Sequence, residues 1–235
     1  MSKGFLITGT DTGVGKTIIA GALIKVLNYI GLKTGAMKPV ESGCGTEADA
    51  LVPYDGMFLK EIAHINDHIS VITPCCFISP LAPLPASEIE NTEVDIAEIK
   101  RSFKRLSVKY EAVVVEGLGG LMVPIKKDYN MADLSLEFGL PLLVVARPGL
   151  GTINHTMLTV NYALNKGLTV AGIILNYSQP PENSLSEKTN PKLLAQISPV
   201  PVIGIFPYMK NLNEDMIAQK ALKNLDIEEI KKYLL

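Results

Sequence analysis

Several features that are rare or absent in the sequence exclude whole classes of protein. It has no tryptophan, only three cysteines, and no uninterrupted apolar run near the about 18–20 residues of a membrane-spanning helix. Its 22 basic and 24 acidic side chains give a net charge of −2, so charge provides no reason to expect binding to nucleic acid or to a membrane. Residues 5–7 lead directly into Gly9, which is not the pattern of a signal peptide.

The cysteines are Cys44, Cys75 and Cys76, and they lack the spacing of a metal or redox motif. We therefore expect free thiols in a reducing compartment, with the cytoplasm as the location. Of the 235 residues, 47% are hydrophobic, and no stretch is polar enough to act as a linker. The sequence predicts one folded domain, residues 1–235.

The strongest local pattern is the run Gly9-Thr10-Asp11-Thr12-Gly13-Val14-Gly15-Lys16-Thr17, which lies between an apolar strand pattern and a helical pattern at 18–30. This is the layout of a phosphate-binding loop (P-loop). Glycines let backbone N–H groups face a polyphosphate, and the helix N-terminus adds positive potential. Lys16 would contact the outer phosphates, and the hydroxyl of Thr17 would bind Mg²⁺.

The spacing of this loop is unusual, because Thr10 stands where the common motif has a glycine and the glycine is Gly9. A strand-to-helix turn without a ligand is the alternative. A Gly-Lys-Thr sequence at the start of a helix, after an N-terminal strand, favours nucleotide binding.

The rest of the chain alternates strand and helix patterns. We expect strands at 33–40, 112–115, 140–146, 169–175 and 200–206, and helices at 49–62, 95–109, 132–138, 154–166 and 190–197. The proline-rich segment 71–93 is expected to be irregular surface structure. The alternation predicts an α/β fold of the P-loop NTPase type: a doubly wound, mostly parallel sheet with helices on both faces.

Ligands of such sheets bind beyond the carboxyl ends of the strands. Polar residues at these ends are Lys38, Glu116, residues 147–151, Asn176 and residues 207–208. All lie at the edge of the sheet that carries the P-loop, so we expect them to form one site.

Individual roles at this edge have alternatives. Glu116 precedes a glycine turn and suits Mg²⁺ opposite Thr17, and Asp49 is a second candidate, although an aspartate that opens a helix is usually a cap. Lys38 could neutralise a transferring phosphoryl group or could be an ordinary surface lysine. His155 follows an anion-binding loop, and a structural role suits it better than a catalytic one.

Five ordered blocks of sequence resemble dethiobiotin synthetase over nearly the whole chain. They are Gly-Thr-Asp-Thr-x-Val-Gly-Lys-Thr at 9–17, Lys-Pro-Val-x-Ser-Gly at 38–43, Val-Glu-Gly-x-Gly-Gly at 115–120, Gly-x-Ile-Asn-His-x-x-Leu-Thr at 151–159 and Asn-x-x-x-Pro-Pro at 176–181. The resemblance explains the spacing at Thr10, because the family's loop has the same additional residue.

The resemblance implies an ATP- and Mg²⁺-dependent ligase of biotin synthesis, which closes 7,8-diaminononanoate and CO₂ into the cyclic urea of dethiobiotin. A carbamate forms, ATP phosphorylates it, and the second amine expels phosphate. By matching positions, Lys38, Lys16 and Thr12 would be catalytic. The nucleotide would contact Gly13, Val14, Gly15, Lys16, Thr17, Ile18, Asp49, Glu116, Gly117, Leu118, Gly119, Asn176, Pro207, Tyr208 and Met209. The metal ligands would be Thr17, Asp49 and Glu116.

The substrate would contact Ser42, Gly151, Thr152, Ile153 and Asn154, with the last four coming from the partner of a homodimer. Three positions differ from some family members. Gly13 replaces a glutamate, Lys188 stands near the position of a tyrosine, and Arg147 is either an anion contact or a surface charge.

Two other classes of protein compete with this interpretation. Related amidoligases carry a C-terminal glutaminase domain, for which the residues after the ATPase-like part leave no space. Partitioning ATPases, which act as dimerisation switches, typically have a lysine after the first loop glycine, whereas this chain has Thr10.

Overall fold

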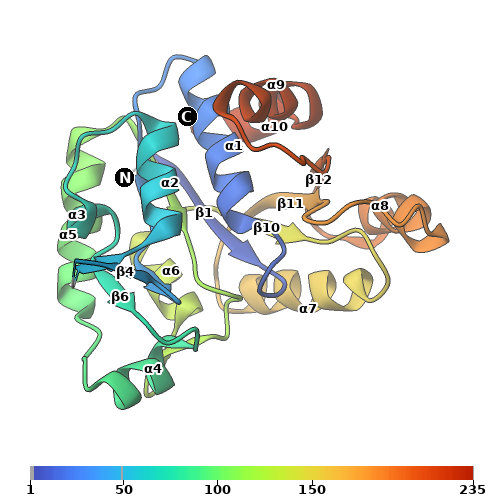
Figure 1. Cartoon of the computed structure of the whole chain (residues 1–235). Coiled ribbons are helices and arrows are strands. Elements are labelled where there is room, and N and C mark those ends of the chain that lie inside the picture. Colours follow the sequence, from blue (N-terminus) through green and yellow to red (C-terminus); the bar gives the residue numbers. More distant parts are fainter. Residues whose placement is uncertain (1–2, 49, 235) are drawn as a thin grey trace.

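A six-stranded parallel sheet forms the centre of the molecule. The computed structural model describes residues 3–48 and 50–234, and within them the sheet order is β12-β11-β10-β1-β7-β2 (Figure 1). The strands are β1 (Gly4–Gly9), β2 (Thr34–Met37), β7 (Ala112–Glu116), β10 (Leu142–Ala146), β11 (Val170–Asn176) and β12 (Val202–Phe206). The predicted α/β fold is confirmed.

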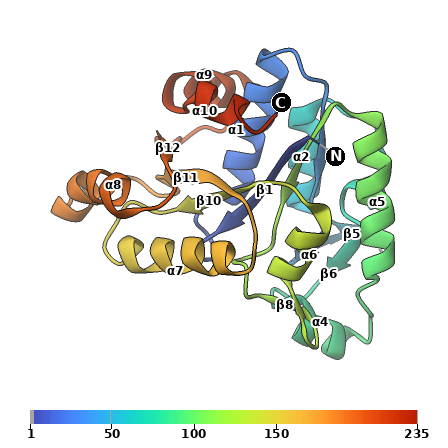
Figure 2. The same ribbon diagram turned by 180° about the vertical axis from the view of Figure 1, so that it is seen from behind.

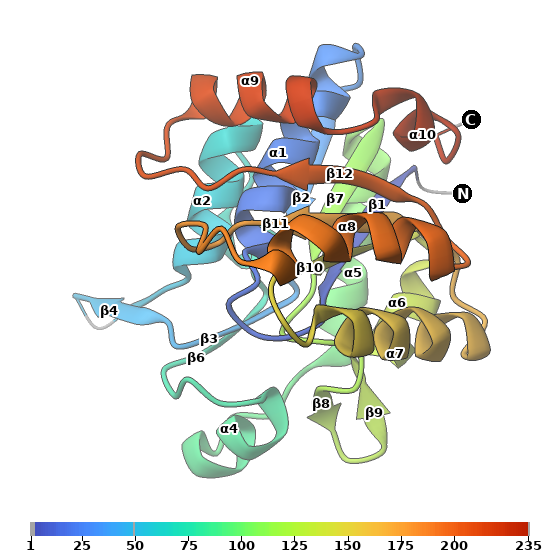
Figure 3. The same cartoon turned by 90° about the vertical axis from the view of Figure 1, so that its right-hand side faces the viewer.

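Helices cover both faces of the sheet, as Figure 3 shows in a view toward the edge strand β12. One face carries α1 (Lys16–Tyr29), α2 (Tyr54–Ala63), α9 (Glu214–Asn224) and α10 (Ile227–Lys231). The other carries α5 (Ile96–Lys109), α6 (Met131–Phe138), α7 (Thr152–Asn165) and α8 (Leu185–Ile197). Because both faces are covered, the central strands are apolar almost throughout and completely buried.

The position of β1 in the sheet determines where the site forms. It pairs with β7 on one side and β10 on the other, with Ile7 opposite Glu116 and Gly9 opposite Val145. The chain moves from β1 outward to β2, and later returns through β7 to cross β1 toward β10. This reversal opens a crevice beyond the carboxyl end of β1, where ligands of such sheets bind.

Smaller elements lie beyond one end of the sheet (Figure 2). They are β3 (Val40–Ser42) paired with β6 (Cys75–Phe77), β4 (Gly45–Glu47) paired with β5 (Ala50–Val52), β8 (Pro124–Lys126) paired with β9 (Tyr129–Asn130), and the short helices α3 (Ile69–Ile72) and α4 (Pro83–Glu90). Of the helices in residues 3–48 and 50–234, none combines the length and the hydrophobicity that crossing a bilayer demands.

Two sequence predictions about this outer region were wrong. The helix expected at 49–62 begins only at Tyr54, because residues 50–52 pair as β5 and Pro53 has an extended backbone at the helix N-cap. The segment 71–93 is not irregular throughout, because it contains β6 and the eight-residue helix α4. Pro83 stands at the start of α4, where a missing N–H group costs no hydrogen bond.

Two further boundaries differ. The strand expected at 33–40 is divided at residues 38–39 into β2 and β3, which belong to different sheets. Lys38 therefore lies between two strands, directly after the end of β2, and not inside a strand. Helix α8 starts five residues earlier than expected, at Leu185, because Ser184 and Glu187 form a reciprocal capping box.

Candidate active site

The P-loop joins β1 to α1 in a conformation that depends on glycine. Gly15 precedes the helix with φ 87°, and a Cβ atom at this position would lie 2.1 Å from Nδ2 of Asn176. Asn176, at the end of β11, donates from Nδ2 to the carbonyl oxygen of Val14 over 2.7 Å. The side-chain amide of Asn176, which the sequence predicted to contact the adenine base, thus holds the P-loop in place. Only glycine fits at position 15, because any Cβ atom there would collide with this amide.

Three oxygen-bearing side chains converge at the start of α1. The hydroxyl oxygen of Thr17 lies 3.1 Å from Oδ1 of Asp55 and 3.0 Å from Oε1 of Glu116. Asp55 is in the first turn of α2, and Glu116 ends β7. The hydroxyl has one proton for two carboxylates, so the cluster is rich in acceptors.

Lys38 completes this cluster. Its Nζ atom lies 2.6 Å from Oε1 of Glu116 and 2.9 Å from Oδ2 of Asp55. Lys38 and Glu116 are almost completely buried, whereas the side chain of Asp55 is 39% exposed. Burial alone would lower the pKa of Lys38, but the carboxylates of Glu116 and Asp55 outweigh burial and raise this pKa above its ordinary value. Lys38 is therefore cationic at neutral pH.

Lys16 lies at the first position of α1 and is also buried. Its Nζ atom donates to the carbonyl oxygen of Asp11 over 3.3 Å. Burial, and then repulsion from Lys38, lower the pKa of Lys16. The two lysines thus concentrate positive charge at one place, which suits a polyphosphate.

The oxygen cluster fits a magnesium ion. Oε2 of Glu116 is buried and has no hydrogen-bond partner, and the other ligands at hand are a carboxylate and a hydroxyl, the hard donors that Mg²⁺ prefers. Residues 3–48 and 50–234 contain no group of three or more His, Cys, Asp or Glu side chains arranged for a metal. Mg²⁺ in nucleotide sites needs no such group, since it commonly binds one or two carboxylates together with substrate phosphates.

The sequence prediction for the second acidic residue was Asp49, which lies outside the described residues. Asp55, six positions later, is the aspartate that contacts Thr17 and Lys38. Asp55 was not predicted as a ligand because the helix was expected to begin earlier, which placed Asp55 in the interior of the helix. Pro53 was the available signal, since proline favours the beginning of a helix.

Two clefts meet at the P-loop and share Thr12 and Gly13. A cleft of about 400 Å³ contains the charged cluster together with Ser42, and is lined by Thr12, Gly13, Gly15, Lys16, Thr17, Lys38, Ser42, Asp55, Pro80, Leu81, Ala82, Glu116, Leu118, Gly119 and Val123. The structure therefore brings together the predicted residues Thr12, Lys16, Lys38, Ser42 and Glu116.

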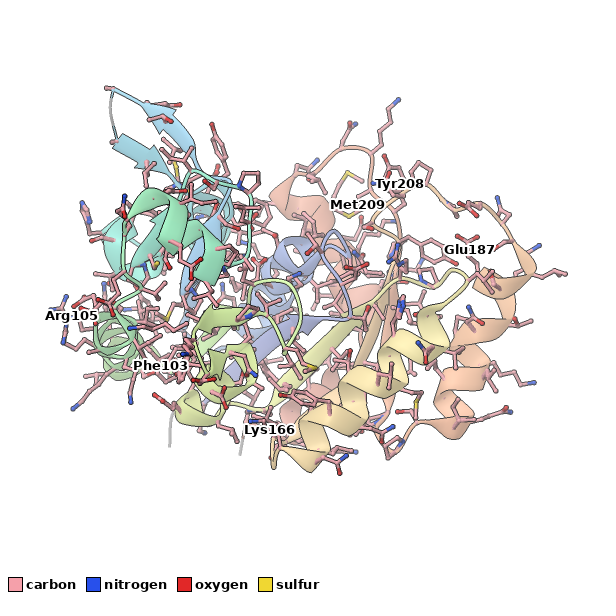
Figure 4. All side chains as sticks on the ribbon, turned by 90° about the horizontal axis from the view of Figure 1, so that it is seen from below. Phe103, Arg105, Lys166, Glu187, Tyr208 and Met209 are labelled. Carbon is pink, nitrogen blue, oxygen red and sulfur yellow. The ribbon has the colours of Figure 1, made fainter. Side chains whose placement is uncertain are left out.

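The second cleft, of about 480 Å³, extends from the loop toward Asn176. It is lined by Thr12, Gly13, Val14, Arg147, Pro148, Gly149, Leu150, Asn176, Tyr177, Ser178, Gln179, Pro180, Glu182 and Glu187. Of the segment predicted to contact a base, residues 207–209, none lines this cleft. They follow β12 at the same edge of the sheet, with Tyr208 partly exposed and Met209 buried (Figure 4).

Residues 147–150, before α7, line the second cleft, whereas residues 151–154 at the start of α7 do not. Gly151 caps α7 with φ 91°, Thr152 is buried against Thr156, and Asn154 is exposed. None of residues 151–154 lines the two clefts. Of these four residues, Gly151 and Asn154 are exposed, whereas Thr152 is buried.

Known proteins with a similar fold include nucleotide-binding ATPases. Residues 3–216 match the family described as AAA domain. The chain is similar to MinD from Pyrococcus horikoshii, solved with Mg-ADP (TM-score 0.52, 18% identity, covering 99% of this chain and 90% of that chain). It is also similar to a ParA family ATPase from Chlorobium tepidum (TM-score 0.55, 14% identity, covering 100% and 97%). At these identities the likeness shows the fold alone.

Sequence relatives are much closer. The chain is 48% identical to the ATP-dependent dethiobiotin synthetase BioD of Thermodesulfovibrio yellowstonii, covering 98% of this chain and 99% of the relative. It is 37% identical to the protein of the same name from Bacillus subtilis subsp. natto, covering 96% of each. With the P-loop, the paired acids and Lys38 in one cleft, these relatives show that the chain belongs to the dethiobiotin synthetase family.

Proposed function

We propose that this chain catalyses the ATP- and Mg²⁺-dependent closure of 7,8-diaminononanoate and CO₂ into dethiobiotin, with release of ADP and phosphate. The observation that carries the proposal is the position of Lys38, buried between Glu116 and Asp55 in the cleft that also holds Lys16, Thr17 and Ser42. A phosphate donor and a small acceptor can therefore meet at one ammonium group. Family membership supports the same reaction.

The reaction has three steps. One amine of the substrate attacks CO₂ to form a carbamate and loses a proton. The carbamate oxygen attacks the γ-phosphorus of ATP, forming a carbamic-phosphoric anhydride and ADP. The second amine attacks the carbamoyl carbon and loses a proton, and the C–O bond to the phosphoryl group breaks with release of phosphate, which closes the urea ring.

The residues of this chain would divide the work. Lys16 and Lys38 would neutralise the charge that spreads over the oxygen atoms of the transferring phosphoryl group, which is the main requirement of such transfers. Thr12, which lines both clefts, and Ser42 would hold the carbamate. Gly13 to Ile18 and Glu116 to Gly119 would surround the phosphates.

Mg²⁺ would be held by Thr17, Glu116 and Asp55, and it would reduce the charge of the ATP phosphates. Asp49 remains a candidate ligand from the sequence. Asn176 and residues 207–209 would contact adenine. Asn176 lines the larger cleft, which supports its part of this assignment.

We further propose a homodimer in which Gly151 to Asn154 contact the substrate carboxylate in the partner's site. The support is that these residues line neither cleft of their own chain, although Gly151 and Asn154 are exposed. Mixing inactive Lys38→Ala subunits with inactive Asn154→Ala subunits should then restore part of the activity, because one site of a mixed dimer is intact. No recovery in a sample shown to contain mixed dimers would contradict shared sites.

The remaining proposals concern the whole chain. Residues 1–235 form one domain, consistent with a single cluster of buried hydrophobic residues in the described part of the chain. Cys44, Cys75 and Cys76 are free thiols, which suits a reducing compartment such as the cytoplasm.

The decisive experiment measures ADP formation by the purified protein with and without each co-substrate. ADP should form only when ATP, bicarbonate and diaminononanoate are all present. Lys16→Ala serves as the control for contaminating ATPases, since it should form no ADP. Brisk ATP turnover without the diamine would contradict the proposal and favour a switch-type ATPase.

A further inference from the structure

Helix α2 begins without a cap from its own residues. Pro53 occupies the N-cap position and makes no side-chain hydrogen bond there, because proline has no acceptor in its side chain. The first backbone N–H groups of any helix have no acceptor within the helix, and a side chain from elsewhere in the fold can supply one.

Glu41 supplies this acceptor. It belongs to β3, and its Oε1 and Oε2 atoms accept hydrogen bonds from the backbone N–H groups of Asp55 over 2.9 Å and of Gly56 over 3.0 Å. Glu41 is only 4% exposed. Burying a carboxylate is costly, whereas a serine at position 53, which is itself buried, could cap the helix without a buried charge. The stabilisation of a helix start therefore does not account for a buried acid at this position.

The start of α2 is tightly packed around the contact with Glu41. A Cβ atom on Gly56 would lie 1.9 Å from Oγ1 of Thr73 and 3.6 Å from Oε2 of Glu41. The start of α2 is thus packed directly against Thr73 on one side while Glu41 binds its amides. Asp55 has its backbone fixed in this way, although its carboxylate is partly exposed and must point at Thr17 and Lys38.

We propose that Glu41 is a positioning residue, which holds the backbone of Asp55 so that its carboxylate lies beside Thr17 as a ligand for Mg²⁺. The inference rests on the metal role proposed above for Asp55. Glu41 itself does not touch the metal or the substrate, since both of its oxygen atoms face backbone amides. Its effect on the metal would pass through the position of Asp55, which its hydrogen bonds to the N–H groups of Asp55 and Gly56 fix.

The test compares Glu41→Ala and the isosteric Glu41→Gln, which keeps one acceptor oxygen, with Asp95→Ala. Asp95 is a matched control because its carboxylate caps α5 by accepting from the backbone N–H of Glu98 over 2.9 Å, on the opposite face of the sheet. The readouts are Mn²⁺ affinity of the enzyme–ADP complex by electron paramagnetic resonance, the Mg²⁺ requirement for ADP formation, and thermal unfolding.

We expect Glu41→Ala to weaken Mn²⁺ binding about 10-fold, the lower end of losses seen when residues supporting a metal ligand are removed, and Glu41→Gln to weaken it less. Asp95→Ala should lower thermal stability and leave Mn²⁺ affinity unchanged. In an Asp55→Ala background, Glu41→Gln should cause no further loss of Mn²⁺ affinity. Unchanged Mn²⁺ affinity in both Glu41 variants, or equal losses with and without Asp55, would overturn the proposal.

The Mn²⁺ measurement also separates this inference from the proposed reaction. If the wild-type protein formed no ADP in a diamine-dependent manner, the reaction would be refuted. The Mn²⁺ affinities of the Glu41 and Asp55 variants would still decide the role of Glu41, because they need only nucleotide and metal.

Discussion

Nζ of Lys38 lies 2.6 Å from Oε1 of Glu116, and both side chains are almost completely buried. A buried ion pair of this kind is a poor source of stability, because both charges lose their hydration. The ion pair lies beside the P-loop, which indicates that it serves function and not stability. In the proposed reaction, the charge of Lys38 would act on the transferring phosphoryl group, and Glu116 would keep that charge in place.

The first prediction concerns Lys38→Ala. The turnover number should fall by about 100-fold or more, because one fixed charge on the transition state is lost, while nucleotide affinity changes little. The variant should also lose about 3–5 kcal/mol of stability, since Glu116 is left buried and unpaired. Steady-state kinetics, ADP titration and chemical unfolding measure the three effects.

The double variant Lys38→Ala/Glu116→Gln is the control for this prediction. It removes both charges, so part of the stability should return while turnover stays low. Equal losses of nucleotide affinity and turnover in Lys38→Ala would show that Lys38 serves binding and not the transferring group.

The second prediction compares two aspartates as metal ligands. Asp55→Ala should raise the Mg²⁺ concentration needed for half-maximal ADP formation by about 10-fold or more, because a carboxylate beside Thr17 is removed. Asp49→Ala should leave it unchanged if Asp55 is the ligand. The same Mg²⁺ titration measures both variants. A higher Mg²⁺ requirement in Asp49→Ala, with none in Asp55→Ala, would show that Asp49 is the ligand, as expected from the sequence.

The contrast between these aspartates shows what the sequence could predict. Lys38, Glu116 and Asn176 were predicted because each stands at the carboxyl end of a strand pattern, and these ends of a parallel sheet lie at one edge. Their positions depend on hydrophobic runs, which are visible in the sequence. The fold class was predictable for the same reason.

Asp55 and Glu41 could not be found in this way. Asp55 lies on a helix whose start depends on docking between β3 and α2, and Glu41 caps that helix from 14 residues away. Neither relationship leaves a local periodic pattern. The positions of residues 207–209 relative to the base likewise depend on how an irregular segment packs, so their role stays a prediction.

The third prediction compares two glycines of the P-loop. Gly15→Ala should abolish nucleotide binding, because its Cβ atom would lie 2.1 Å from Nδ2 of Asn176 and displace the amide that holds Val14. Gly13→Ala is the matched control. It also has positive φ, 76°, but no atom lies within 4 Å of its added Cβ.

The cost of Gly13→Ala should therefore be only the backbone strain, about 1–2 kcal/mol. Isothermal titration with ADP and thermal unfolding separate the two effects. Equal loss of ADP affinity in both variants would show that the contact with Asn176 is not what makes Gly15 necessary.

The fourth prediction concerns stability in acid. Hydrogen bonds from Lys25 over 2.5 Å and with His64 over 2.6 Å hold the pKa of Glu214 below its usual value of 4.5. A carboxyl group with a depressed pKa in the folded state stabilises the protein above its unfolded pKa, and this contribution disappears as pH falls through the folded value.

The wild-type protein should therefore lose this contribution from about pH 5 downward, because the unfolded chain begins to bind the proton at a higher pH than the folded protein does. Glu214→Gln should be less stable than wild type near pH 7, and the difference should vanish in acid. Urea unfolding at a series of pH values measures it. A difference that stays constant between pH 7 and pH 3 would exclude the ion pair as its cause.

The fifth prediction concerns Arg147, for which the sequence left an anion contact and a surface charge open. Its Nη2 atom lies 2.6 Å from Oδ2 of Asp11, and both side chains are about half exposed. Exposed ion pairs contribute only about 0–1 kcal/mol, so Arg147→Gln should hardly change the unfolding temperature. Oδ1 of Asp11 accepts from the backbone N–H of Thr12 over 2.7 Å, so the pair also orients the turn that both clefts share.

Arg147→Gln should therefore raise the KM for ATP several-fold with little change in stability, and Asp11→Asn should do the same. The double variant should be no worse than either single one, because the two residues act through one contact. Steady-state kinetics at several salt concentrations checks this, since an exposed pair weakens as salt rises. Additive losses in the double variant would show that Arg147 acts on the nucleotide directly and not through Asp11.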